Sequence, residues 1–170
     1  MRVAFVVGAD EPAAYPTERA GDPQDWGAKL ATAAALGREV TARALRAAGH
    51  GRRTFALERD AAGEVVVHLV RMRQTGAALR AMGDQESWQA VSAETARRFP
   101  DGVKVWAVTG FVRHDPVTGS APGHYALGGG TLAVMSANSL STWPSDLADV
   151  PAAFADTTRV AGTGWMDDSL

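Results

Sequence analysis

Two hydrophobic periods divide the chain into predicted strands and helices. Residues 3–7 (VAFVV) are continuously apolar and end at Gly8, which is typical of a buried strand. Between residues 25 and 48, apolar positions recur at gaps of four and three, which predicts one long amphipathic helix that ends before Gly49. Small residues on its apolar stripe indicate close packing on a sheet. The stripe consists of Trp26, Leu30, Ala33, Gly37, Val40 and Ala44.

The middle of the chain is predicted to form a hairpin and two shorter helices. The hairpin has strands at residues 54–58 and 64–71, joined by a turn at residues 60–63. Thr75 and Asp84 are suitable N-caps for the two helices, because their side-chain oxygens can accept hydrogen bonds from the first helical N–H groups.

The order of these elements indicates the fold class. Residues 103–112 form the longest predicted strand, and a short helix is expected at residues 145–155. Strands and helices in this order predict an α/β (α+β) fold, with a mixed β-sheet of about four or five strands packed with two main helices. A length of 170 residues, without a repeat or a long linker, predicts a single domain over residues 1–170.

Composition narrows the functional classes. A net charge of −2 and a pI near 6.1 are not the electrostatic footprint of a nucleic-acid-binding protein. The absence of cysteine excludes disulfides and cysteine-ligated zinc. No apolar stretch approaches the roughly 18 residues of a membrane span, and the first apolar run is too short for a signal peptide. We therefore expect a cytoplasmic protein whose partners include neither nucleic acid nor membrane.

Three consecutive glycines precede a short apolar run, TLAVMS, that starts at Thr131. Glycine permits sharp bends and the close approach of another chain, so the run is predicted to be a strand at the edge of the sheet. An edge strand has unpaired N–H and C=O groups with which an extended peptide can pair. A glycine-rich loop that leads into an ordinary strand is the alternative. The candidate substrate-binding residues are Gly128, Gly129, Gly130, Thr131, Leu132, Ala133, Val134 and Met135.

No catalytic motif is recognisable in the residues alone. The sequence lacks H-E-x-x-H, G-x-S-x-G and a phosphate-binding loop with its lysine, and it has no cysteine nucleophile. His114 and His124 lie ten residues apart around a predicted loop and are weak candidates for a metal site. A small enzyme with a site built from these histidines, Asp115 and Tyr125 therefore remains one interpretation.

Several motifs resemble those of a zincin-like zinc metallopeptidase family of fungal and actinobacterial type. Residues 123–130 (GHYALGGG), 143–145 (WPS) and 154–158 (FADTT) are similar to successive parts of that family. Residues 49–55 (GHGRRTF) and 67–71 (VHLVR) are similar to earlier parts. The resemblance spans nearly the whole chain, and its glycine and Trp-Pro pieces are the most specific.

The resemblance implies the N-terminal, sheet-bearing subdomain of a zincin fold, with zinc as the cofactor. In that family, the edge strand above the zinc pairs with the extended substrate, a role that would fall to residues 130–135 here. The family's catalytic His-Glu-x-x-His helix follows this segment. No residue of the present sequence matches it, so no zinc ligand and no general base can be assigned.

Two functional hypotheses lead. In the first, the chain is the substrate-binding portion of a zinc metallopeptidase-like protein, catalytically incomplete alone. The catalytic half then lies elsewhere in a longer protein or on a partner polypeptide, and the substrate is an extended peptide or protein. In the second, the chain is a non-enzymatic module that binds peptides or proteins. The sequence leaves open whether the chain is an enzyme.

Overall fold

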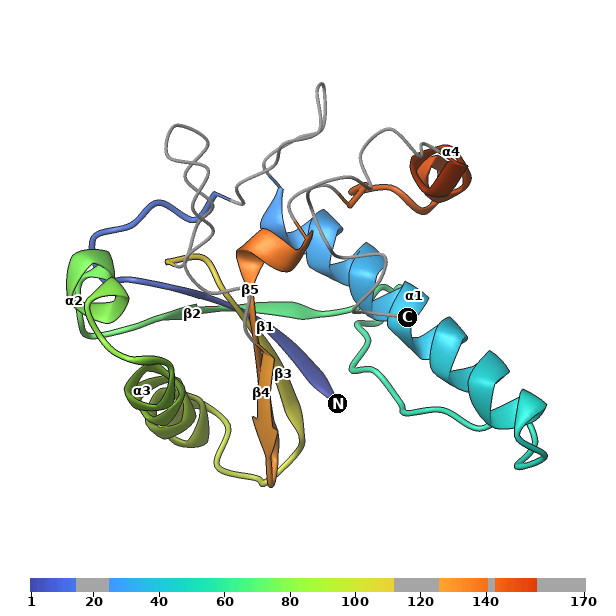
Figure 1. Cartoon of the computed structure of the whole chain (residues 1–170), viewed down its shortest axis with the longest axis horizontal. Coiled ribbons are helices and arrows are strands. Elements are labelled where there is room, and N and C mark those ends of the chain that lie inside the picture. The colour runs from blue at the N-terminus through green and yellow to red at the C-terminus, as the bar shows by residue number, and fades with distance from the viewer. Residues whose placement is uncertain (15–24, 112–125, 141–142, 156–170) are drawn as a thin grey trace.

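The computed structural model describes residues 1–14, 25–111, 126–140 and 143–155, and its centre is a five-stranded mixed sheet (Figure 1). The strand order is β2-β1-β3-β5-β4. Neighbouring strands are parallel except for β4, which runs antiparallel to β5. The predicted α/β class and mixed sheet are thus confirmed. The strands are β1 (Arg2–Val7), β2 (Val67–Arg71), β3 (Val105–Thr109), β4 (Ala126–Gly129) and β5 (Leu132–Ser136).

Helices cover both faces of the sheet. The long helix α1 lies on one face, and the shorter α2 and α3 lie on the other, so the described structure has three layers (Figure 1). Single 3-10 turns at Ala137–Leu140 and Leu147–Asp149 follow β5. The helices are α1 (Trp26–Ala47), α2 (Gly76–Arg80), α3 (Asp84–Arg98) and α4 (Val150–Ala155).

The central strand β1 is apolar throughout because both of its faces are covered. Ala4 and Val6 belong to the hydrophobic cluster on the side of α2 and α3, whereas Val3, Phe5 and Val7 belong to the cluster on the side of α1. All five residues are fully buried. A continuous apolar run in place of alternation is the pattern of a parallel strand between two layers.

Helix α1 begins at an N-cap. The Asp25 side chain accepts hydrogen bonds from the N–H groups of Gly27 and Ala28, at 2.8 and 3.1 Å. The predicted apolar stripe is correct for Leu30 and Ala33, which are buried, but wrong for Val40, which is 40% exposed. The second half of the helix extends beyond the strands it covers, so its stripe has little sheet to pack on (Figure 1).

The predicted hairpin forms only in part. Its turn is present, but residues 54–58 are not a strand, and a single antiparallel bridge joins Arg59 to Val65. The Glu58 N–H donates instead to the carbonyl of Met1, at 3.0 Å. This segment therefore binds the start of the chain, with too few hydrogen bonds to extend the sheet.

Candidate functional site

The antiparallel strand β4 forms one edge of the sheet and pairs only with β5 among the described residues (Figure 1). The prediction that the run TLAVMS (residues 131–136) lies at the edge is therefore wrong for Leu132–Ser136. These residues lie in β5, where Val134 pairs with Ala107 of β3 on one side and with Leu127 of β4 on the other. The edge is one strand further out because the chain turns back before the apolar run.

A two-residue turn that starts at Gly130 joins β4 to β5. Gly130 has a φ of 58°, and glycine at the first position of such a turn is typical of a type II′ hairpin. The pair that flanks the turn, Gly129 and Leu132, exchanges hydrogen bonds, and bonded and non-bonded pairs alternate beyond it. The backbone groups of Ala126 and Gly128 therefore point away from β5, towards the open edge.

At Gly128 and Gly129 this edge has no side chain on either face. A Cβ placed on Gly129 would lie 3.8 Å from Cζ2 of Trp88, on the side of α3. A Cβ placed on Gly128 would lie 3.9 Å from the Cβ of Ala133, on the opposite face. Ala126, Gly128 and Gly129 are all exposed in the part of the chain that the structure describes. The edge thus presents backbone rather than side chains.

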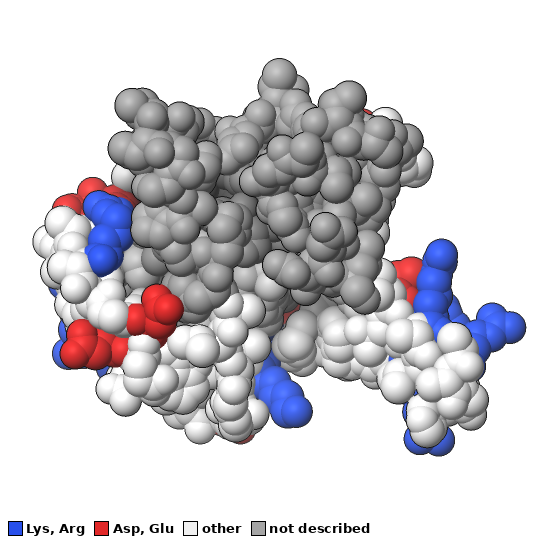
Figure 2. Space-filling view, viewed as in Figure 1, with Lys and Arg blue, Asp and Glu red and all other residues white. Residues whose placement is uncertain are grey.

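The surface around the lower end of β4 carries few charges. Charged side chains gather over α2 and α3 on one side and at the end of α1 on the other (Figure 2). Between these groups the described surface in this view is mostly uncharged, apart from a basic group near its lower centre (Figure 2). A ligand at this edge therefore meets mainly backbone dipoles and apolar atoms.

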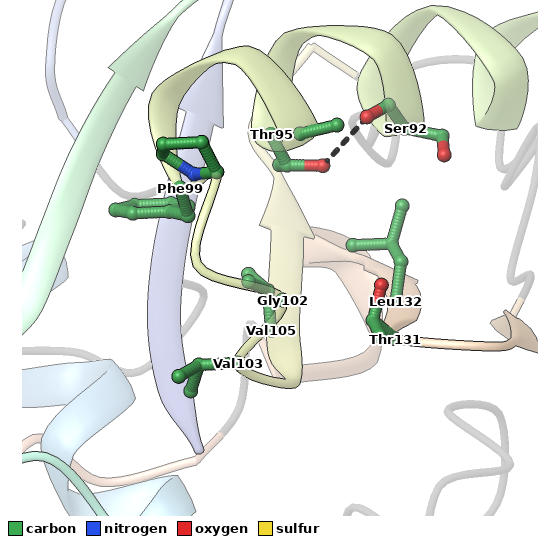
Figure 3. Close-up of a pocket in the computed structure, with 10 residues that line it drawn as sticks. Ser92, Thr95, Phe99, Gly102, Val103, Val105, Thr131 and Leu132 are labelled. Atoms are coloured by element: carbon green, nitrogen blue, oxygen red, sulfur yellow. Dashed lines mark hydrogen bonds between the residues drawn. The ribbon is translucent and has the colours of Figure 1, made fainter.

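A small cavity lies between the end of α3 and the beginnings of β3 and β5 (Figure 3). Its volume is about 150 Å³, below the roughly 300–1,000 Å³ of ordinary small-molecule sites. The Thr95 hydroxyl in its wall donates to the carbonyl of Val91 and is therefore not available as a donor. The cavity fits one side chain better than a cofactor. Its walls include Ser92, Thr95, Phe99, Val105, Thr131 and Leu132.

A larger apolar cleft lies on the other face, between α1 and the sheet. Its volume is about 280 Å³. The buried Lys29 ammonium donates to the carbonyl of Trp143, and the Thr32 hydroxyl donates to the carbonyl of Ser145 at 2.8 Å. These bonds from α1 hold the Trp-Pro-Ser segment, whose Trp143 forms one wall of the cleft. The other walls include Ala33, Gly37, Trp106, Met135 and Leu140.

Charged groups form a network at the start of the sheet, away from the edge strand. Arg2 donates to Glu58 at 3.0 Å and to Asp101 at 2.6 Å, and His68 Nε2 lies 2.9 Å from the same Glu58 oxygen. The hydrogen bond from His68, aided by the charge of Arg2, lowers the pKa of Glu58. The hydrogen bond from Arg2 lowers the pKa of Asp101. The network joins β1 and β2 to the segments that contain Glu58 and Asp101.

The described residues do not fit a zinc ion. No group of three histidine, aspartate or glutamate side chains lies close enough to hold a metal in residues 1–14, 25–111, 126–140 and 143–155. His68 packs against the ring of Phe99 and pairs with Glu58. The candidate metal ligands His114 and His124, with Asp115 and Tyr125, lie outside the described residues.

Comparison with known proteins decides the family. The whole chain, residues 1–170, matches the sequence profile of a family described as "Putative peptidase family" (Metallopep). The chain belongs to this peptidase family. It is also 28% identical over 179 residues to a protein of Schizosaccharomyces pombe named "Putative zinc metalloproteinase", covering 93% of this chain and 29% of that protein. The resemblance read from the glycine and Trp-Pro motifs is thus confirmed at the level of a zinc metallopeptidase family.

Solved structures share the fold. OgpA from Akkermansia muciniphila, in a catalytically inactive form with an O-glycopeptide substrate, matches with a TM-score of 0.56 and 17% identity, over 81% of this chain and 38% of OgpA. Wild-type OgpA matches with a TM-score of 0.56 and 18% identity, over 82% and 39%. The chain thus spans less than a third of the yeast protein and about two-fifths of OgpA.

Sequence reasoning missed part of the edge. Ala126 and Leu127 open β4, yet they were not among the candidates, and Trp88 lies beneath Gly129 from a distant helix. A glycine at the start of a two-residue turn is a recognised hairpin signal and could have indicated β4.

The helices of the described segments include none with the length and apolar character needed to cross a bilayer.

Proposed function

We propose that this chain is the substrate-binding part of a zinc metallopeptidase, in which the open edge of β4 binds an extended peptide. The observation that carries the proposal is the position of β4. It is an antiparallel edge strand whose alternate residues, Ala126 and Gly128, direct backbone groups outwards. A peptide that adds a strand here gains main-chain hydrogen bonds in the manner of β-augmentation.

In this proposal, polypeptide beyond the described residues supplies the catalytic half of the metallopeptidase. A hydrolytic zinc site needs about three protein ligands and a base, and the described side chains supply no such group. The apolar cleft between α1 and the sheet supports this division, because half-buried apolar residues of the described segments, among them Trp106 and Met135, line it. We assign this cleft to the segment that carries the zinc ligands, either in the same longer protein or on a partner chain.

A non-enzymatic module that binds peptides is the second candidate. The absence of a H-E-x-x-H motif from all 170 residues favours it over catalysis by the chain alone. Both candidates share the β4 edge, so they differ in turnover and not in the mode of binding. The cytoplasmic location expected from the sequence belongs to the same proposal, and fractionation of expressing cells tests it.

Zinc content and peptide turnover separate the two candidates. We expect the dialysed chain to contain close to no zinc, and to bind fluorescein-labelled octapeptides without cleaving them. Addition of the catalytic polypeptide should then bring both zinc and cleavage if the first candidate is correct, and neither if the second is. About one zinc per chain would contradict the proposed division and would direct attention to His124.

Backbone methylation tests the edge-strand contact. Two octapeptides of one sequence are compared, with N-methyl groups on the odd or on the even residues. A peptide that pairs along one edge loses its hydrogen bonds in only one of the two patterns. In the protein, Gly128→Pro removes an outward N–H at an edge position that tolerates proline, so binding should fall while the circular dichroism spectrum is kept. Equal binding of both methylated peptides would refute the edge-strand contact.

A further inference from the structure

Gly128 and Gly129 are not required by the fold of the described chain. Neither residue has a positive φ, so the backbone conformation does not demand glycine. The nearest atoms to an added Cβ lie at 3.9 Å for Gly128 and 3.8 Å for Gly129, which is ordinary van der Waals contact. Alanine therefore fits at both positions. Gly110 is the opposite case, because its added Cβ would lie 2.7 Å from Phe5.

Two glycines in a strand of four residues reduce stability. Glycine loses more conformational freedom on folding than any other residue and has no side chain to pack. A glycine inside a strand that neither φ nor packing explains often marks a place where a ligand or another backbone approaches closely. At the edge of a sheet, the approaching chain is the one that pairs there.

The two faces of this edge differ in what the missing side chains uncover. On the face of Gly128, the nearest atom is the small methyl group of Ala133. On the face of Gly129, it is the ring of Trp88, which is only partly buried and packs against the cluster beneath α3. Side chains directly opposite each other on paired strands lie about 4.5–5.5 Å apart at Cβ. A peptide side chain opposite Gly129 therefore comes within reach of the indole.

We propose that Gly129 and Trp88 form a specificity subsite, at which a bound peptide places a large apolar or aromatic side chain on the Trp88 ring. This inference rests on the proposed function, since it needs a peptide paired with β4. The substrate class it names is an extended peptide with a phenylalanine, tyrosine or leucine at the residue that faces Gly129. The described surface around β4 carries few charges, apart from a basic group beside it, and so favours an apolar side chain over a charged one (Figure 2).

The test uses fluorescein-labelled, acetylated octapeptides of alternating threonine and alanine, with one central residue changed to Phe, Leu, Ala or Asp. Their affinities for the full 170-residue chain are measured by fluorescence anisotropy. We expect the Phe peptide to bind about three- to tenfold more tightly than the Ala peptide, the range of an aromatic contact. Trp88→Leu should reduce this ratio to near one by weakening the Phe peptide more than the Ala peptide, a selective loss that a merely structural role of Trp88 would not produce.

Substitution of Gly129 should affect stability and peptide preference differently. Gly129→Ala and Gly129→Val should raise the urea midpoint or leave it unchanged, and should abolish the preference for Phe, because the new side chain covers the indole. Gly37→Ala is the matched control: it has no neighbouring atom within 4 Å, lies in α1 on the opposite face of the sheet from Trp88, and should keep the preference. A loss of stability together with a kept preference in Gly129→Ala would overturn the subsite.

The outcomes separate the subsite from the proposed function. If the octapeptides bind, and one N-methylation pattern blocks them, but all four central residues bind equally, the subsite is wrong and the edge-strand contact stands. If no octapeptide binds at any concentration that leaves the chain monodisperse, both are wrong. A Phe preference that is unchanged in both Trp88→Leu and Gly129→Val overturns the subsite alone.

Discussion

The Nε2 atom of His68 lies 2.9 Å from Oε2 of Glu58, which ties β2 to the segment before the hairpin turn. The same carboxylate oxygen accepts a hydrogen bond from Arg2 Nε at 3.0 Å. These contacts lower the pKa of Glu58 from its ordinary value of 4.5, with the hydrogen bond from His68 as the largest cause. The start of the sheet is therefore held by a carboxylate that must stay ionised.

Stability should fall in acid because of this network. A carboxylate whose pKa is lowered by folding stabilises the protein above its unfolded pKa, and that stability is lost as the pH falls through the folded pKa. The urea midpoint of the wild type should therefore decline below about pH 4.5, the ordinary pKa of glutamate. Glu58→Gln should cost about 0.5–1 kcal/mol at pH 7 and should show a shallower decline in acid.

The exposed Glu64 provides the control for this experiment. Glu64→Gln should match the wild type at pH 7 and decline with the same slope in acid. The midpoints are measured by tryptophan fluorescence from pH 7 to pH 3. If Glu58→Gln and Glu64→Gln give superimposable curves, the His68–Glu58–Arg2 contacts contribute nothing to folding.

Gly110→Ala should be strongly destabilising. The added Cβ would lie 2.7 Å from Cζ of Phe5, a fully buried ring that stacks on Trp26 with centroids 5.9 Å apart. Crowding of this kind in a packed core costs about 1–3 kcal/mol. Urea unfolding at pH 7 measures the loss, and Gly37→Ala, with open space around it inside α1, should not lower stability. Equal midpoints for the two variants would mean that Phe5 can move aside at little cost.

The sequence predicts those elements whose hydrophobic period is long and regular. The apolar run of β1 and the repeat of α1 specify a strand covered on both faces and a helix packed on it, and both are present. The prediction of a strand at residues 54–58 was wrong, because alternation of apolar and polar residues does not show whether a partner strand lies alongside. The Glu58 N–H bonds to Met1 and not to a neighbouring strand.

The predicted edge of the sheet was misplaced by one strand, and the binding role of its residues stays a prediction. The four residues of β4, ALGG, include two glycines and do not alternate between apolar and polar. The hydrophobic pattern therefore does not predict a strand there. Their antiparallel pairing with residues 132–135 of β5 identifies them as a strand. Trp88 could not be predicted either, because its contact with Gly129 joins residues 41 positions apart through the tertiary fold.

Asp25→Ala should weaken the start of α1. The Asp25 carboxylate accepts from the N–H groups of Gly27 and Ala28, which otherwise have no partner within the helix. Loss of an N-cap of this type costs about 0.5–2 kcal/mol, whereas Asp25→Asn keeps an acceptor and should cost much less. Thermal unfolding followed by circular dichroism at 222 nm measures both. Asn and Ala variants of equal stability would show that the side-chain cap does not matter.

Lys29→Met should loosen the wall of the apolar cleft. Lys29 is fully buried, and its ammonium donates to the carbonyl of Trp143, which lines the cleft. Methionine retains a long apolar stem but leaves that buried carbonyl without this donor, at a cost of about 1–3 kcal/mol. The freed segment should also expose Trp143, so its fluorescence should shift to longer wavelength before global unfolding.

Lys104→Met is the comparison for this variant, because Lys104 is an exposed lysine. It should leave both the urea midpoint and the native emission maximum unchanged. A dye that binds apolar surface should bind Lys29→Met more strongly than Lys104→Met, since the cleft between α1 and the sheet widens when its wall moves. If the two variants agree in stability, emission and dye binding, the Lys29–Trp143 bond does not fix the cleft. The Trp-Pro-Ser segment must then be held by the Thr32–Ser145 contact and by packing.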